Sequence, residues 1–230
     1  MASPFPVSKS LINGAAGAIE IAAHISDAQM PTAVAVVAHP HPLFGGTMDN
    51  KVATTLARAL FDAGAATYRF NFRGIGNTEG VHDDGRGETA DLLTVAAHAR
   101  AVHPGLPLWL SGFSFGAAVT LAASEQLNCQ EMILIAPGFS RMSHWQNVKS
   151  GGVAPETTLL IHGEKDETVP LIDSLNWARP RDIAVMVVPE ADHFFHQRLH
   201  ILRRIIGRWM AQHACATTAT IAGTIQPKHA

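Results

Sequence analysis

Short, continuous apolar runs alternate with longer helical patterns along most of this chain. Residues 32–38 (TAVAVVA) form such a run with no polar alternation, and residues 131–136 and 157–161 have the same character. A strand has this composition when both of its faces are buried, as in a parallel sheet covered by helices. Residues 50–64, by contrast, carry apolar side chains at helical spacing. The alternation therefore predicts an α/β fold, with a mostly parallel central sheet flanked by helices on both faces.

The same patterns divide the rest of the chain. Further strands are predicted over residues 17–26, 66–72, 106–111 and 183–188, the first of them as an antiparallel edge strand. Further helices are predicted over residues 88–102 and 115–125, and from residue 194 to the end of the apolar spacing near Trp209. No internal repeat or linker interrupts this series. We expect a single domain over residues 1–213, followed by a loosely ordered tail over residues 214–230 that is rich in Thr, Ala and Gly.

Charge and composition argue against several classes of partner. The chain has 230 residues and a net charge of -2, which gives no reason to expect nucleic-acid binding. No stretch approaches the roughly 18 apolar residues of a membrane span, and the first residues lack a secretory signal pattern. The two cysteines, Cys129 and Cys215, have no metal-like spacing. We expect a cytoplasmic protein with no cofactor and no metal, whose oligomeric state, a homodimer included, is left open.

The segment Gly112-Phe113-Ser114-Phe115-Gly116 lies between a predicted strand and a predicted helix. In this context Gly-X-Ser-X-Gly forms a sharp turn that holds the serine hydroxyl clear of the sheet, and its glycines avoid clashes with the strand and helix. The N-terminus of the following helix also brings free N–H groups close to the serine. The plainer alternative is a turn whose serine only caps the helix. Ser114 is therefore a candidate nucleophile that needs a base and an acid.

Candidates for the base and the acid follow two later strands. In serine enzymes with this turn, the order along the chain is serine, acid, histidine. Asp166 lies in the turn after the strand predicted over residues 157–161, and His193 follows the strand predicted over residues 183–188. Carboxyl ends of parallel strands meet at one edge of a sheet, so we expect both side chains near the serine. Glu164 and Glu167 are in the same turn as Asp166, and chemistry alone does not exclude them.

The loop after the first buried strand begins His39-Pro40-His41-Pro42-Leu43. In such enzymes one backbone N–H of this loop, together with the N–H of Phe115, stabilises the oxyanion of the reaction. Proline has no N–H, which leaves His41 or Leu43, and we favour His41 because it is nearer to the strand. Two histidines one residue apart could also suggest a metal site, but no further ligand cluster accompanies them.

Two polar segments follow the strand predicted over residues 66–72. Residues 74–80 (GIGNTEG) depart from the dinucleotide-binding pattern Gly-X-Gly-X-X-Gly, and we interpret them as a structural turn. Asp83, Asp84, Arg86 and Glu88 are then predicted to form a solvated loop that leads into the next helix.

Taken together, these motifs resemble the α/β-hydrolase superfamily over nearly the whole chain up to about Trp209. More narrowly, five segments look like those of small bacterial serine hydrolases that lack a lid and are often described as carboxylesterase-like. These segments are residues 39–50, 70–76, 112–116, 162–166 and 191–193. Dienelactone hydrolases are similar, except that their nucleophile is cysteine. The resemblance implies an α/β-hydrolase fold without a cap domain, Ser114 as nucleophile, Asp166 as acid and His193 as base.

The function we expect is hydrolysis of carboxylic esters with small or short-chain acyl groups, through an acyl-enzyme intermediate. Residues 138–156 are too few to form a cap, so the site should be open and shallow. The candidate apolar walls of the substrate pocket are Phe44, Phe113, Phe115, Met142, Trp145 and Phe194. The alternatives are a thioesterase or peptidase that uses the same three residues or, from a different class, a non-catalytic binding module.

Overall fold

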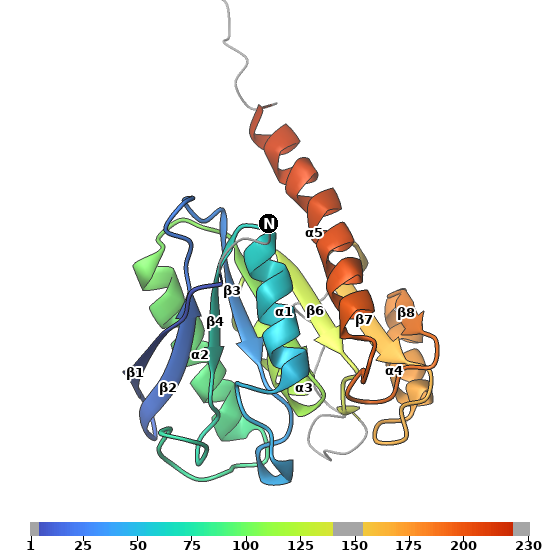
Figure 1. Ribbon diagram of the computed structural model, residues 1–230, viewed down its shortest axis with the longest axis horizontal. Coiled ribbons are helices and arrows are strands. Elements are labelled where there is room, and N and C mark those ends of the chain that lie inside the picture. Colours follow the sequence, from blue (N-terminus) through green and yellow to red (C-terminus); the bar gives the residue numbers. More distant parts are fainter. Residues whose placement is uncertain (1–4, 140–153, 223–230) are drawn as a thin grey trace, which may run out of the picture.

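One sheet runs through the protein and carries helices on both of its faces (Figure 1). The computed structural model describes the fold of residues 5–139 and 154–222, with side chains up to residue 213. In this part of the chain, eight strands lie in the order β1-β2-β4-β3-β5-β6-β7-β8. Their bounds are β1 Ser8–Gly14, β2 Gly17–His24, β3 Ala33–Ala38, β4 Ala65–Phe70, β5 Leu108–Phe113, β6 Glu131–Ile135, β7 Thr158–Gly163 and β8 Val185–Val188. The pairs β1/β2 and β2/β4 are antiparallel and the remaining pairs are parallel, as the predicted fold class requires.

The helices divide between the two faces of the sheet. Their bounds are α1 Lys51–Asp62, α2 Arg86–Val102, α3 Phe115–Ser124, α4 Leu171–Ala178 and α5 Leu199–Ala222. Helices α1 and α5 pack on one face, which is the near face in Figure 1, and α2 and α3 pack on the other. Strands β3 to β7 are buried along their whole length, because helices cover them on both sides. Within the described residues, no helix is both long and apolar enough to cross a membrane.

Three features differ from the sequence predictions. Strand β1 was not predicted, because most of its residues are exposed and it pairs with β2 alone. It replaces β2 as the edge strand. Helix α4 was also not predicted, since its eight residues are too few to show a clear helical spacing of apolar side chains. Helix α5 continues to Ala222, beyond Trp209, near which the apolar spacing predicted its end.

The strand register aligns the carboxyl ends of the central strands. Ala38 pairs with Gly112, Phe113 pairs with Ile135, and Gly163 pairs with Val188. Strands β4 and β5 pair with β3 on opposite sides, so the direction in which the sheet is built reverses between β3 and β5. In open α/β sheets the crevice at such a reversal is where ligands bind. The loops after β3, β5, β7 and β8 therefore meet at one edge.

Two buried histidines, His24 and His39, should make the stability of the fold sensitive to acid. Burial lowers the pKa of each to about 4, from an ordinary value of 6.5. Between these values the unfolded chain binds protons that the folded chain does not, so the free energy of unfolding should fall as the pH drops from 6.5 to 4. The loss is on the order of 3 kcal/mol per histidine. Urea titrations between pH 7 and pH 4 measure it.

The replacement His24→Gln is the matched test, because His24 is remote from the edge described above. This side chain accepts a hydrogen bond from Arg69 Nε (3.2 Å) and bonds to the Pro6 carbonyl (2.7 Å). The variant should be less stable at pH 7 but should lose less stability between pH 7 and pH 4 than the wild type. An unchanged loss would show that His24 does not contribute to the acid sensitivity.

Candidate active site

The turn after β5 holds Ser114 in a strained backbone conformation, with φ 56° and ψ −116°. The two glycines of the motif make this turn sterically feasible. A Cβ atom on Gly112 would lie 2.3 Å from the Gly116 carbonyl oxygen, and one on Gly116 would lie 2.3 Å from the His39 carbonyl oxygen. The glycines thus allow strand β5, helix α3 and the loop after β3 to approach one another closely, as the motif predicted. A non-glycine residue at positive φ costs energy and is often found at a functional site.

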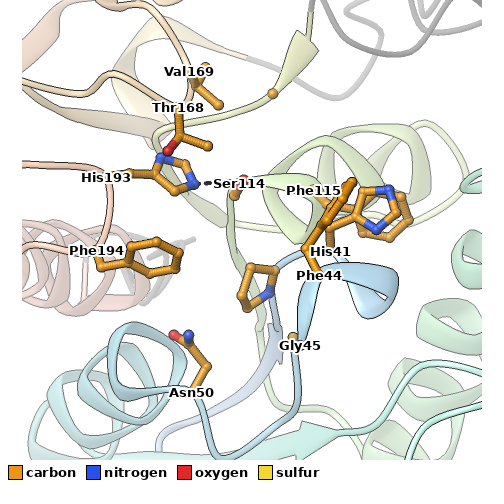
Figure 2. A pocket seen from close by; sticks show the side chains of 13 residues that line it. His41, Phe44, Gly45, Asn50, Ser114, Phe115, Thr168, Val169, His193 and Phe194 are labelled. Atoms are coloured by element: carbon orange, nitrogen blue, oxygen red, sulfur yellow. Dashed lines mark hydrogen bonds between the residues drawn. The ribbon is translucent and has the colours of Figure 1, made fainter.

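Ser114, His193 and Asp166 form one hydrogen-bonded chain. Ser114 Oγ lies 3.0 Å from His193 Nε2 (Figure 2), and His193 Nδ1 lies 2.7 Å from Asp166 Oδ2. All three residues are at most 9% exposed, so their interactions are only weakly screened by water. The structure therefore brings together the three residues that the sequence singled out from loops after β5, β7 and β8.

The Asp166 carboxylate is held by more than His193. Its Oδ1 accepts hydrogen bonds from the N–H groups of Thr168 (2.9 Å) and Val169 (2.7 Å). Burial acts to raise the pKa of this carboxyl, but hydrogen bonds from His162, His193 and Val169 outweigh it and hold the pKa well below its usual range. The group is thus kept ionised and oriented. Glu164 and Glu167, which the sequence left as alternatives, are exposed.

His162 is a second histidine on this carboxylate. Its Nε2 lies 2.9 Å from the Val169 carbonyl oxygen and 3.3 Å from Asp166 Oδ2. Both partners only accept hydrogen bonds, so Nε2 carries the proton and Nδ1 accepts from the hydroxyl of Ser174 (2.8 Å). The sequence analysis missed this role, although His162 begins the motif that contains Asp166.

The loop after β3 presents the His41 N–H rather than the Leu43 N–H. The N–H of Leu43 donates to His41 Nδ1 (3.2 Å), whereas the N–H of His41 donates to none of the described residues. His39 orients this peptide unit. Its Nε2 accepts from the Phe72 N–H (3.0 Å), so its Nδ1 carries the proton and donates to the Pro40 carbonyl (2.6 Å). In a trans peptide the C=O and N–H point in opposite directions, so this bond turns the His41 N–H away from the buried His39 ring.

A cavity of about 700 Å³ opens at Ser114 and His193. Its walls are largely aromatic, aliphatic and glycine residues (Figure 2). The described residues that line it are Pro40, His41, Phe44, Gly45, Gly46, Asn50, Ser114, Phe115, Gly138, Thr168, Val169, His193 and Phe194. Of the predicted pocket walls, Phe44, Phe115 and Phe194 are in this set. Met142 and Trp145 lie outside the described residues.

Two predictions at this edge need correction. Phe113 does not line the cavity; it is fully buried and packs behind His193, with ring centroids 4.8 Å apart. Glu88 is not solvated but fully buried, and it accepts hydrogen bonds from the N–H groups of Asp83 (3.0 Å) and Gly85 (2.8 Å). Its Oε1 also lies 2.9 Å from His82 Nδ1. The burial of Phe113 involves His193, which is distant in the chain, whereas the contacts described here for Glu88 come from residues 82–85, just before its helix.

The sequence analysis also missed polar residues in the cavity wall. Asn50 precedes α1 and Thr168 follows β7, both at the edge where the loops meet. Their position at that edge was the one sequence feature that pointed to them. The residues around Asn50 do not distinguish an asparagine that lines a cavity from one that only caps a helix. Within the described residues, no group of three or more His, Cys, Asp or Glu side chains is placed to hold a metal ion.

Two solved structures and one further sequence are similar to this chain. The chain has 35% identity with an α/β serine hydrolase without a lid from Xanthomonas campestris, with a TM-score of 0.83 over 91% of this chain and 96% of that one. An α/β serine hydrolase homologue from Coxiella burnetii has 34% identity and a TM-score of 0.81, over 87% and 96% of the two chains. An uncharacterised protein from Rickettsia prowazekii (strain Madrid E) has 29% identity over 208 residues, which is 86% of each chain.

A family model described as "Serine aminopeptidase, S33" matches residues 31–155, which is more than half of the chain. The matched region includes the loop after β3 and the Ser114 turn. On these grounds the chain is a serine hydrolase that belongs to the α/β-hydrolase superfamily and, within it, to the serine aminopeptidase S33 family.

Proposed function

We propose that this protein hydrolyses carboxylic esters of small or short-chain acyl groups through an acyl-enzyme intermediate. The observation that carries this proposal is the hydrogen-bonded chain Ser114–His193–Asp166 at the base of a largely apolar cavity. A serine hydroxyl is a weak nucleophile on its own and needs such a base, itself oriented by a third group, to react. Apolar walls suit an uncharged acyl chain.

The reaction proceeds in two acyl-transfer steps. Ser114 Oγ attacks the ester carbonyl while His193 Nε2 takes its proton, and the resulting tetrahedral intermediate carries a negative oxygen. His193 then gives the proton to the leaving alcohol as the C–O bond breaks. In the second step His193 takes a proton from water, the hydroxide oxygen attacks the acyl-enzyme, and the proton returns to Ser114 as the acid leaves. Asp166 stays ionised and stabilises the protonated histidine throughout.

Two backbone N–H groups are proposed to bind the negative oxygen. Phe115 is the first residue of α3, where helical N–H groups have no partner within the helix. His41 is the second donor, because its N–H is turned away from the His39 ring and the residue lines the cavity. Each such donor typically lowers the barrier by about 3 kcal/mol. Leu43 is the weaker candidate, since its N–H already donates to His41 Nδ1 and the residue does not line the cavity.

The second candidate is an aminopeptidase, because the matching family model has that description. Such an enzyme must bind the positively charged α-amino group of its substrate, for which a carboxylate in the cavity is the natural partner. None of the described residues that line the cavity is Asp or Glu. Residues 140–153, whose positions are not described, contain no Asp or Glu in their sequence either. The charges therefore favour a neutral ester over a peptide with a free amino group.

A panel of three substrate classes tests the proposal: p-nitrophenyl esters from acetate to decanoate, an acyl-thioester of matched chain length, and aminoacyl p-nitroanilides. We expect ester turnover with the highest kcat/KM for the short chains, and anilide turnover at background. Turnover of the thioester alone, or of the anilides alone, would replace the ester proposal with a thioesterase or an aminopeptidase. Labelling by a fluorophosphonate probe tests the non-catalytic alternative, because only an activated serine forms the adduct.

A further inference from the structure

Asn50 lies in the cavity wall, and one of its polar groups bonds to none of the described residues. Its N–H donates to the Thr47 carbonyl (3.0 Å), and its carbonyl accepts from the Thr54 N–H (2.8 Å). Its side-chain Oδ1 accepts from the N–H groups of Val52 (2.9 Å) and Ala53 (3.3 Å), which caps helix α1. This cap determines which arm of the amide is oxygen and which is nitrogen.

The Asn50 amide nitrogen is therefore the remaining polar group of this residue. Its two hydrogens donate to none of the described residues. Figure 2 shows the Asn50 amide near Phe194, across the cavity from Thr168. The residue is only half-buried, so its amide nitrogen can be hydrated in the free protein. A substrate that displaces this water must supply an acceptor or leave the nitrogen unsatisfied, which costs free energy.

The neighbours of Asn50 make this donor selective. The labelled cavity residues nearest to it in Figure 2 are Phe194 and Gly45, and neither has a polar side chain to supply an alternative partner. The hydrogen-bonded residues Ser114, His193 and Asp166 act at the scissile ester group, and so do the two proposed oxyanion donors. Asn50 lies farther along the cavity wall from Ser114 (Figure 2), where a part of the substrate beyond the scissile group would extend.

We propose that Asn50 is a specificity-determining residue, and that its amide nitrogen donates a hydrogen bond to a carbonyl or hydroxyl oxygen on a side arm of the substrate. The substrate class is thus an ester whose chain bears an oxygen acceptor a few bonds from the scissile carbonyl. This inference rests on the proposed ester hydrolysis. It adds a polar requirement that the aromatic walls alone do not impose.

Paired substrates of equal length test this inference. One series consists of p-nitrophenyl heptanoate and its analogues with a ketone at carbon 4, 5 or 6. A second series consists of heptyl acetate and the matching ketone-bearing alcohol esters, which covers an arm on the leaving-group side. We expect the wild type to prefer one ketone position, in one of the two series, by about tenfold in kcat/KM over the plain alkyl ester. The preference is a ratio within one enzyme, so a general loss of activity does not affect it.

Two replacements of Asn50 keep the helix cap and remove the amide N–H donors. Asn50→Ser leaves a hydroxyl that can cap α1 but is too short to reach the arm, so the preference should fall to about one. Asn50→Asp keeps the shape and the cap but presents only acceptors, so the ketone ester should become the poorer substrate. Lys51→Ala is the matched control, because Lys51 is the exposed neighbour and does not line the cavity, and it should keep the wild-type preference.

The outcomes separate this inference from the proposed function. If the wild type turns over the ketone and alkyl esters equally at every position, the Asn50 inference is wrong and ester hydrolysis stands. If the wild type shows a preference that both Asn50 variants retain, the acceptor binds elsewhere and the inference is also wrong. If neither series is turned over by the wild type, ester hydrolysis itself fails. Thermal melts of both variants check that the cap has been kept.

Discussion

Replacing Ser114 with alanine is expected to lower kcat for short-chain ester hydrolysis by about a millionfold while leaving the protein folded. The hydroxyl is the proposed nucleophile, and its hydrogen bond to His193 (3.0 Å) is the only bond that its Oγ makes among the described residues. The variant loses little packing, so the free energy of unfolding should change by about 1 kcal/mol or less. Steady-state kinetics with p-nitrophenyl acetate and a urea titration measure the two effects.

Two further variants sharpen this prediction. Ser114→Gly should be equally inactive but more stable than Ser114→Ala, because glycine adopts φ 56° without the cost that a side chain incurs. Ser124→Ala is the control serine, since Ser124 lies within α3 and donates to the Leu121 carbonyl (2.7 Å). It should retain both activity and fluorophosphonate labelling. If Ser114→Ala kept activity near that of the wild type, the nucleophile would have to be another residue.

Replacing Asp166 with asparagine should lower kcat by about ten-thousandfold with little change in KM. The structure provides a specific reason. The N–H groups of Thr168 and Val169 both point at Oδ1, so the asparagine must place its oxygen there and turn its NH₂ group toward His193 Nδ1. His193 Nδ1 must then accept a hydrogen bond, which moves the imidazole proton to Nε2. A protonated Nε2 cannot take the proton from Ser114.

The neighbouring carboxylates provide the controls for this variant. Glu164→Gln and Glu167→Gln remove the two acids that the sequence could not exclude, both of which are exposed. Each should leave kcat within about threefold of the wild-type value, because surface charges act weakly through water. If one of these variants lost as much activity as Asp166→Asn, the acid of the site would have been misassigned. Circular dichroism spectra confirm that all three variants are folded.

Much of the fold could be predicted because the buried strands are recognisable from their own amino-acid composition. Strands β3, β6 and β7 are apolar on both faces, and this composition is found where helices cover both sides of a sheet. Strand β1 was missed for the converse reason. It is an exposed edge whose register depends on its hairpin with β2, from the pair Gly14 and Gly17 onward, rather than on a buried face.

The candidate site was predicted where a short sequence motif has a fixed geometry. The turn at Ser114 needs Gly112 and Gly116 at fixed spacing, because a Cβ atom on either would clash with backbone. The pocket walls were less predictable. Phe113 and Phe115 flank the same serine, yet Phe113 packs behind His193 while Phe115 faces the cavity. Alternation along a strand would put residues 113 and 115 on the same face. The sharp turn at Ser114 sends the two side chains in different directions instead, and which direction holds the substrate depends on where the later loops lie.

The class of fold, the turn that carries Ser114, and the order of acid and base could be predicted from the sequence alone. The first two have local signatures, namely apolar runs and glycines at fixed spacing around a serine, and the third follows from the order in enzymes with this turn. The folded structure was needed to show that Asp166 meets His193, that the His41 N–H has no partner among the described residues, and that Asn50 faces the cavity. Each of these depends on contacts between residues far apart in the chain. Such contacts are set by how the strand ends align at one edge of the sheet.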